Sequence, residues 1–197
     1  MPKVSDEYRQ ARREEILAAA ERAFAAKGYQ RTSISDVLAE SGLSTGAVYA
    51  HFTGKQDLFV AVARDTLLRR TAALEREAAG GPPPSPGQML RILLESLLRE
   101  GGDPQLLVQL WSEATIEPSI RAAVNELVQV ARTAFDARLR RWFAEHPEHA
   151  PDGTDVAVRD VVPVMLALAQ GFLIQHAILD DFDPDAYLDA VAAVLPG

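Results

Sequence analysis

The sequence predicts an all-α protein of about nine helices. Three observations favour this class: apolar residues recur at helical spacing along almost all of the 197 residues, no convincing stretch alternates as a strand would, and glycines or prolines punctuate the apolar stretches. The hydrophobic fraction of 48% is sufficient for a packed core in one sizeable domain or two small ones.

The first helix is predicted at 5–27. Gly28 is its C-terminal stop, because glycine readily takes the backbone conformations that end helices. Its buried face is formed by Ile16, Leu17, Ala20, Ala23 and Phe24.

Two short helices and a longer one are predicted next. Ser33 and Asp36 have the spacing of a capping box, in which each side chain satisfies a free backbone N–H group at the start of a helix. Ser44 can cap the second short helix in the same way, and glycines separate the three elements. The predicted ranges are 34–41, 45–51 and 55–79.

A proline-rich loop and five further helices follow. The loop, GGPPPSPG at 80–87, is predicted because serial prolines cannot continue a helix, and HPEHAPDGT at 146–154 is a second loop. The helices are predicted at 86–100, 104–116, 119–146, 155–180 and 184–195.

Composition excludes several kinds of site. The chain has no cysteine, so disulfides and thiolate zinc sites are unavailable, which fits a reducing cytoplasm. No signal peptide is predicted, and the most apolar stretch, 161–179, is interrupted by proline, glutamine and histidine, so we expect no membrane contact. The acidic turn DDFDPD at 180–185 lacks the glycine and closing glutamate of a calcium loop, and we expect no metal site.

Charge is unevenly distributed along the chain. The net charge is -8, yet residues 1–60 contain eight basic and eight acidic residues, whereas 61–197 contain twelve and twenty. All three lysines lie in the first part. The acidity therefore belongs to the C-terminal two-thirds, and a local basic face near the N-terminus is compatible with it.

The two short helices, joined by SGLS and preceded by a longer helix, predict a helix-turn-helix. In this motif the second helix enters the major groove of DNA with its N-terminal residues first. Val48 and Phe52 are expected in the core, while small residues let the backbone approach the duplex and Tyr49 and Lys55 reach phosphate. The candidate DNA contacts are Thr32, Ser33, Ser44, Thr45, Gly46, Ala47, Tyr49, His51 and Lys55.

The same residues carry a resemblance to a known family. GYQRTSISDVLAESGLSTGAVYAHFTGKQDLF resembles the signature of the N-terminal domain of TetR-family bacterial transcriptional regulators, and the similarity covers residues 9–60. Leu38 stands where that family often has alanine, and Thr45 where it often has lysine. The resemblance implies a homodimer that binds a palindromic operator in double-stranded DNA and is released by a small-molecule effector. It also implies a DNA-binding domain at 1–54, a connecting helix at 55–79 and an effector-binding and dimerisation domain at 80–197.

The C-terminal helices offer candidates for the two remaining roles. Aromatic and sulfur-containing side chains there are at core spacing, and filling the core is the alternative to lining a pocket. The pocket candidates are Trp111, Met165, Phe172 and His176. Small residues four apart, flanked by larger ones, permit close helix pairing, and the dimer-interface candidates are Ala167, Leu168, Gly171, Gln175, Leu179 and Tyr187.

These observations predict a sequence-specific transcriptional regulator, a repressor, that needs no cofactor apart from its effector. The alternative is a helical enzyme or small-molecule carrier whose N-terminal helices are only structural. An enzyme needs converging acid, base or nucleophilic groups, and the four histidines and scattered carboxylates form no recognisable set. DNA binding is therefore the preferred hypothesis.

Overall fold

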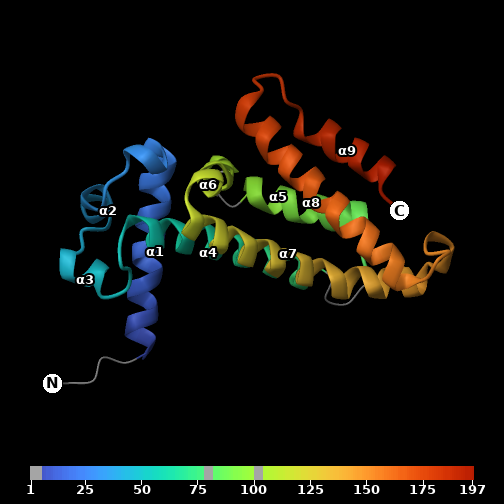
Figure 1. The fold of residues 1–197 in the computed structure, drawn as a ribbon, viewed down its shortest axis with the longest axis horizontal. Coiled ribbons are helices and arrows are strands. Elements are labelled where there is room, and N and C mark those ends of the chain that lie inside the picture. The colour runs from blue at the N-terminus through green and yellow to red at the C-terminus, as the bar shows by residue number, and fades with distance from the viewer. Residues whose placement is uncertain (1–5, 78–81, 100–103) are drawn as a thin grey trace.

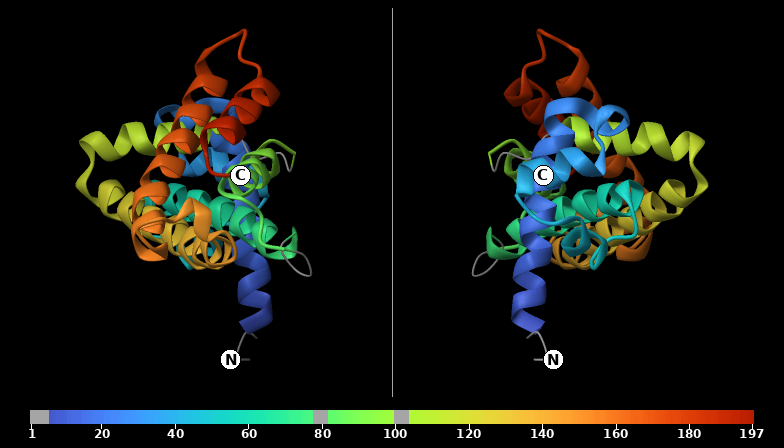
Figure 2. Two further views of the ribbon diagram at one scale, coloured as in Figure 1. Left: turned by 90° about the vertical axis from the view of Figure 1, so that its right-hand side faces the viewer. Right: turned by 90° about the vertical axis from the view of Figure 1, so that its left-hand side faces the viewer.

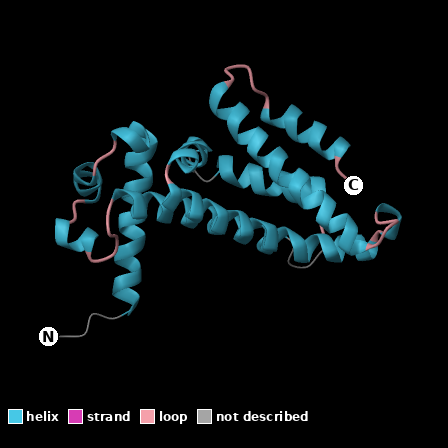
Figure 3. Ribbon diagram, viewed as in Figure 1, coloured by secondary structure: helices cyan, strands magenta, loops and turns pink. Residues whose placement is uncertain are grey.

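The computed structural model of the protein describes residues 6–77, 82–99 and 104–197. Within these ranges the chain folds into nine α-helices and one short 3-10 helix, with no strand (Figure 3). The predicted all-α class is confirmed. The α-helices are α1 (Asp6–Arg31), α2 (Ile34–Ser41), α3 (Thr45–Tyr49), α4 (Lys55–Glu77), α5 (Pro86–Arg99), α6 (Pro104–Ile116), α7 (Pro118–Glu145), α8 (Thr154–Ile178) and α9 (Pro184–Val194).

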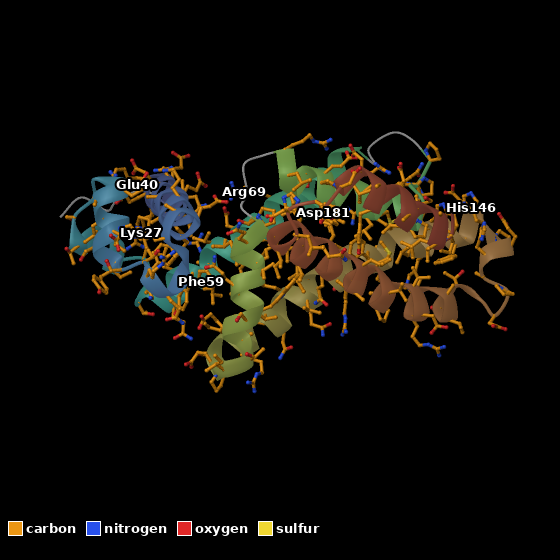
Figure 4. All side chains as sticks on the ribbon, turned by 90° about the horizontal axis from the view of Figure 1, so that it is seen from above. Lys27, Glu40, Phe59, Arg69, His146 and Asp181 are labelled. Atoms are coloured by element: carbon orange, nitrogen blue, oxygen red, sulfur yellow. The ribbon has the colours of Figure 1, made fainter. Side chains whose placement is uncertain are left out.

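The N-terminal helices form one end of the molecule. In Figure 1, α2 and α3 lie beside α1 at the left, and α4 runs from them into the rest of the chain. The predicted apolar face of α1 is buried, and the Phe24 ring meets the Phe59 ring of α4 edge-on at 5.1 Å between centroids. Figure 4 shows Phe59 between the N-terminal helices and the remaining helices. This packing fixes the start of α4 against α1.

Two glycines end helices as predicted. Gly28 has φ 74° and ψ 160°, so the helical geometry of α1 breaks there and resumes only for a short turn up to Arg31. Gly42 follows α2 in the left-handed conformation, with φ 68° and ψ 11°, and its N–H donates to the Leu38 carbonyl. Both backbone conformations favour glycine because a Cβ atom would strain them.

The remaining helices pack along α4. Figures 1 and 2 show α4 and α7 running side by side, with α8 crossing above α7 and α9 beside α8 near the C-terminus. Helix α6 contacts α1, α4, α7 and α8, so it touches both ends of the molecule. The predicted proline-rich loop at 80–87 falls partly outside the described residues, and α5 begins at Pro86.

Two local features lie at and after the end of α7. The loop after α7 contains a 3-10 turn at Pro147–His149, where the His146 ring stacks on Trp142 at 4.5 Å. Pro163 lies inside α8, which begins nine residues earlier at Thr154, close to the predicted start of this helix at 155. A proline inside a helix removes one N–H donor from the backbone hydrogen bonds of that helix.

Helix α8 is unusually apolar for its exposure. Its most apolar window of 18 residues has a mean hydropathy of 1.7, but only 22% of that window is buried. By length and composition alone, it is the one described helix that could cross a membrane. Its inner face packs against α5, α6, α7 and α9, so an apolar outer face is left uncovered.

Candidate DNA-binding surface and small-molecule cavity

The capping box at the start of α2 is formed as predicted. The Asp36 N–H donates to Ser33 Oγ at 3.2 Å, and the Ser33 N–H donates to Asp36 Oδ2 at 2.8 Å. Lys27 also donates to Asp36, and this hydrogen bond, followed by those from Ser33, holds the pKa of the Asp36 carboxyl well below its ordinary range. The cap therefore fixes α2 to the end of α1 through one ionised side chain.

The short helix α3 presents the predicted recognition residues to solvent. Ser44 caps it by accepting from the Ala47 N–H at 3.3 Å, and Val48 and Phe52 point into the core. Tyr49 lies on the opposite side, with 53% of its surface exposed. The exposed residues at the start of the helix are Ser44, Thr45 and Gly46, with Ala47 half-buried. These side chains are short, so the helix start can approach a base edge closely.

Thr32 has a structural role that the sequence did not reveal. Its side chain is 2% exposed, and its Oγ1 lies 2.7 Å from the Gly28 carbonyl and 3.1 Å from the Ala23 carbonyl. The hydroxyl thus satisfies carbonyls at the break in α1 and faces away from solvent. The expectation that Thr32 contacts phosphate is therefore corrected, whereas Ser33 next to it is exposed.

Lys55 also differs from the expectation. Its Nζ donates to the Tyr29 carbonyl at 3.0 Å and to the Gln30 carbonyl at 3.3 Å, and it lies 4.5 Å from the centre of the Tyr29 ring. The ammonium therefore joins α4 to the turn after Gly28 in the chain free of DNA. His51 is half-buried beside Phe52, at 6.4 Å between ring centroids.

A second set of contacts joins the same turn to α6. Gln109 accepts from the Tyr29 N–H at 2.7 Å, and the Gln30 side-chain amide donates to Glu113 at 2.7 Å. Burial raises the pKa of the Tyr29 hydroxyl, and the negative charges of Glu113 and Glu117 raise it further. No sequence signal marks these residues, because the hydrogen-bonded partners are about eighty positions apart.

A small apolar cavity lies between α4, α5, α6, α7 and α8. Its volume is about 90 Å³. The described residues that line it are Leu67, Leu93, Leu94, Leu97, Leu107, Leu110, Trp111, Val124, Leu127, Val128, Ala131, Phe135, Leu166, Ala169, Gln170 and Leu173. Trp111, one of the predicted pocket residues, lines this cavity. Gln170 contributes a side-chain amide to the lining.

The other three pocket candidates lie outside this cavity. Met165 is fully buried in the core. Phe172 and His176 stack at 5.9 Å and, with Phe182 and Tyr187, form an aromatic cluster between α8 and α9. These three residues lie on the helix that the sequence predicted, but a shift of one or two residues along α8 decides which side of the helix a side chain occupies.

The dimer-interface candidates divide between two roles. The Tyr187 hydroxyl donates to the Leu168 carbonyl at 2.8 Å, and a Cβ at Gly171 would lie 3.1 Å from that hydroxyl. Gly171 therefore allows α9 to pack on α8 within one chain. Ala167 and Leu179 are exposed, while Gln175 is half-buried.

The region of the helix-turn-helix is similar to known bacterial regulators. The family model described as "Bacterial regulatory proteins, tetR family" matches residues 16–62, the region of the helix-turn-helix. The chain is 41% identical over 81 residues to the HTH-type transcriptional repressor Rv1474c of Mycobacterium tuberculosis, covering 41% of this chain and 43% of that protein. It is 34% identical over 128 residues to the regulator TtgR of Pseudomonas putida, covering 65% and 54%. The chain thus spans about half or less of the length of these relatives.

Solved structures share the whole fold. A TetR transcription regulator from Haloarcula marismortui has a TM-score of 0.78 at 22% identity, covering 93% of this chain and 96% of that one. A regulator from Saccharomonospora viridis in complex with choline has a TM-score of 0.71 at 21% identity, covering 93% and 95%. At these identities the likeness shows that the arrangement of helices is shared.

Proposed function

We propose that this chain, whose N-terminal domain belongs to the TetR family of bacterial regulatory proteins, is a homodimeric transcriptional repressor that a small molecule releases from DNA. The observation that carries the DNA-binding part is the orientation of α3. Val48 of α3 and Phe52 just after this helix are buried in the core, whereas Thr45, Gly46 and Tyr49 of α3 are exposed at the surface. Side chains so placed can read base edges and hold phosphate when α3 lies in the major groove.

A mobility-shift assay tests this function. The protein is titrated into DNA from upstream of its own gene and into a random-sequence selection, and we expect a palindromic site to bind far more tightly than competitor DNA. Tyr49→Ala should weaken that binding, and the exposed α7 variant Val130→Ala is the control. Binding no tighter than to competitor DNA, in both libraries, would refute the proposal.

The apolar outer face of α8 supports the dimer. Val164, Ala167, Ile174 and Ile178 follow one another at spacings of three, seven and four residues, so they form one exposed stripe, with the half-buried Gly171 between Ala167 and Ile174. Ile178 is 65% exposed in the single chain. Covering such a stripe with its two-fold copy removes apolar surface from water, and the small exposed Ala167 allows close approach.

Light scattering after size exclusion tests the dimer. The chain mass is 21.4 kDa, and we expect the protein to elute with about twice that mass. Ala167→Arg places a charge in the stripe and should give the single-chain mass, whereas Ala122→Arg on the exposed side of α7 should leave the dimer intact. A monomeric unmutated protein would contradict this assembly.

The contacts of α4 and α6 support control by an effector. Leu67 of α4 and Trp111 of α6 line the cavity, and Lys55 and Gln109 of the same two helices hold the turn after Gly28. A ligand that separates α4 from α6 would therefore move the turn after Gly28, and with it the helix-turn-helix. In a dimer the two recognition helices must lie about 34–36 Å apart to enter successive major grooves, so a small rotation weakens binding.

An enzyme of the same fold is the less supported alternative. The named relatives are transcriptional regulators. The described groups whose pKa is shifted lie in surface ion pairs or are the half-buried Tyr29 and Tyr187, and none of them lines the cavity. Binding to chromosomal DNA places the protein in the cytoplasm.

A further inference from the structure

We propose that the effector is an uncharged, mainly apolar molecule, about the size of one substituted ring, with one polar group that pairs with Gln170. This inference rests on the proposed function, since it names the chemical class of ligand that the cavity between α4 and α8 takes. It is carried by the lining of that cavity, which is apolar throughout its described residues apart from one amide and the indole N–H of Trp111.

The lining excludes an ionic ligand. No described lining residue carries a charge. Moving an unpaired carboxylate or ammonium group from water into apolar surroundings is strongly unfavourable unless an opposite charge or several hydrogen bonds compensate. One glutamine amide cannot provide that compensation. A neutral ligand loses little hydration and gains contacts with leucine, valine and phenylalanine side chains.

Gln170 provides a polar group in the lining of the cavity. It is half-buried on α8, and no hydrogen bond joins it to another described residue. A primary amide both donates and accepts, so it can pair with a hydroxyl, an amide or a carbonyl group. A ligand with one such group satisfies the amide inside the cavity, and a ligand without one leaves it unpaired.

The size of the cavity links binding to movement. A cavity of about 90 Å³ is smaller than the cavity of about 150 Å³ that holds a benzene molecule in another protein. A ligand with one ring therefore has to displace lining side chains of α4, α6 or α7. Because protein interiors are close-packed, such displacement moves helices as well as side chains. A ligand of this class thus favours a conformation that differs from the ligand-free one.

Four probes that share one ring separate the possibilities. Toluene and benzyl alcohol are neutral, benzoate is an anion and benzylammonium is a cation. We expect saturating benzyl alcohol to raise the Tm of the full-length protein by about 3–6 °C, with toluene weaker and both ions without effect. Stabilisation by either ion equal to that by benzyl alcohol, or stabilisation by none of the probes, would overturn the inference.

Two variants locate the binding. Ala131→Leu adds three carbon atoms to the cavity wall and should abolish the Tm shift, whereas Ala122→Leu on the exposed side of the same helix should keep it. Gln170→Leu should remove the advantage of benzyl alcohol over toluene. Persistence of the shift in Ala131→Leu would place the ligand elsewhere. DNA binding measured without any probe distinguishes two failures. If only this inference is wrong, the protein still binds its operator. If the proposed repressor function is wrong, the protein does not bind it.

Discussion

The contact between Gln109 and the Tyr29 N–H gives the sharpest test of communication between the cavity and the DNA-binding helices. Gln109→Met keeps the length of the side chain and removes the acceptor. In the structure the acceptor oxygen lies 2.7 Å from the Tyr29 nitrogen in a partly buried site. A Cβ atom at Gly28 would lie 3.5 Å from Oε1 of Gln109, so the Gln109 side chain packs against this turn from the α6 side.

The expected magnitude follows from this geometry. Loss of one partner of a partly buried hydrogen bond costs about 1 kcal/mol. For a chain of this size, that cost lowers Tm by about 2–4 °C. If the contact favours the DNA-binding orientation, the same 1 kcal/mol lowers operator affinity about fivefold, within the 1–3 kcal/mol typical of coupling between sites. An effector should then cause a smaller further loss of affinity than it does in the unmutated protein.

Thermal unfolding and mobility shifts with and without benzyl alcohol measure both effects. Gln129→Met is the matched control, because Gln129 is exposed on α7 and far along the chain from the turn. An unchanged Tm together with an unchanged response to the ligand would refute the reasoning. A lowered Tm with an unchanged response would assign Gln109 to stability alone.

Three further predictions concern the helix-turn-helix and its support. Lys55→Met should lower Tm by about 2–4 °C while leaving the salt dependence of DNA binding unchanged, because its ammonium already donates to two carbonyls. A slope reduced by about 0.9 would show that it contacts phosphate in the complex. Gly42→Ala should destabilise the protein by about 1 kcal/mol in denaturant unfolding, since φ is 68° and no neighbouring atom interferes. The lowered pKa of Asp36 stabilises the fold above the unfolded value of about 3.9, so the stability difference between the protein and Asp36→Asn should shrink as pH falls below about 4, and a constant difference would contradict this role.

Local features of the N-terminal helices were predictable from the sequence. The capping box at Ser33, the cap at Ser44 and the stops at Gly28 and Gly42 involve residues at most four positions apart, so their physical chemistry is contained in short stretches of sequence. The burial of Val48 follows equally from helical periodicity. Helix boundaries agreed within a few residues for the same reason.

The orientation of individual polar side chains was not predictable. Thr32 and Lys55 have the composition of phosphate contacts, and both are engaged by carbonyls that only the folded chain brings near them. Of the four pocket candidates, Trp111 lines the cavity and the three on α8 do not, because α8 faces the cavity at Gln170 and the aromatic cluster at Phe172, two positions further on. Periodicity identifies a buried face, but it does not say which neighbours fill the space opposite.

Helix α6 contacts both the cavity and the turn at the N-terminal end of the molecule. Leu107, Leu110 and Trp111 face the cavity, while Gln109 and Glu113 bond to the turn that follows Gly28. The helix has 13 residues and holds both sets of contacts within two turns, so a displacement of one face necessarily displaces the other. Lys55 connects the same turn to α4, which also lines the cavity through Leu67. The turn after Gly28 is thus held between the two helices that a ligand would push apart, and the ligand needs no contact with the recognition helix to change its position.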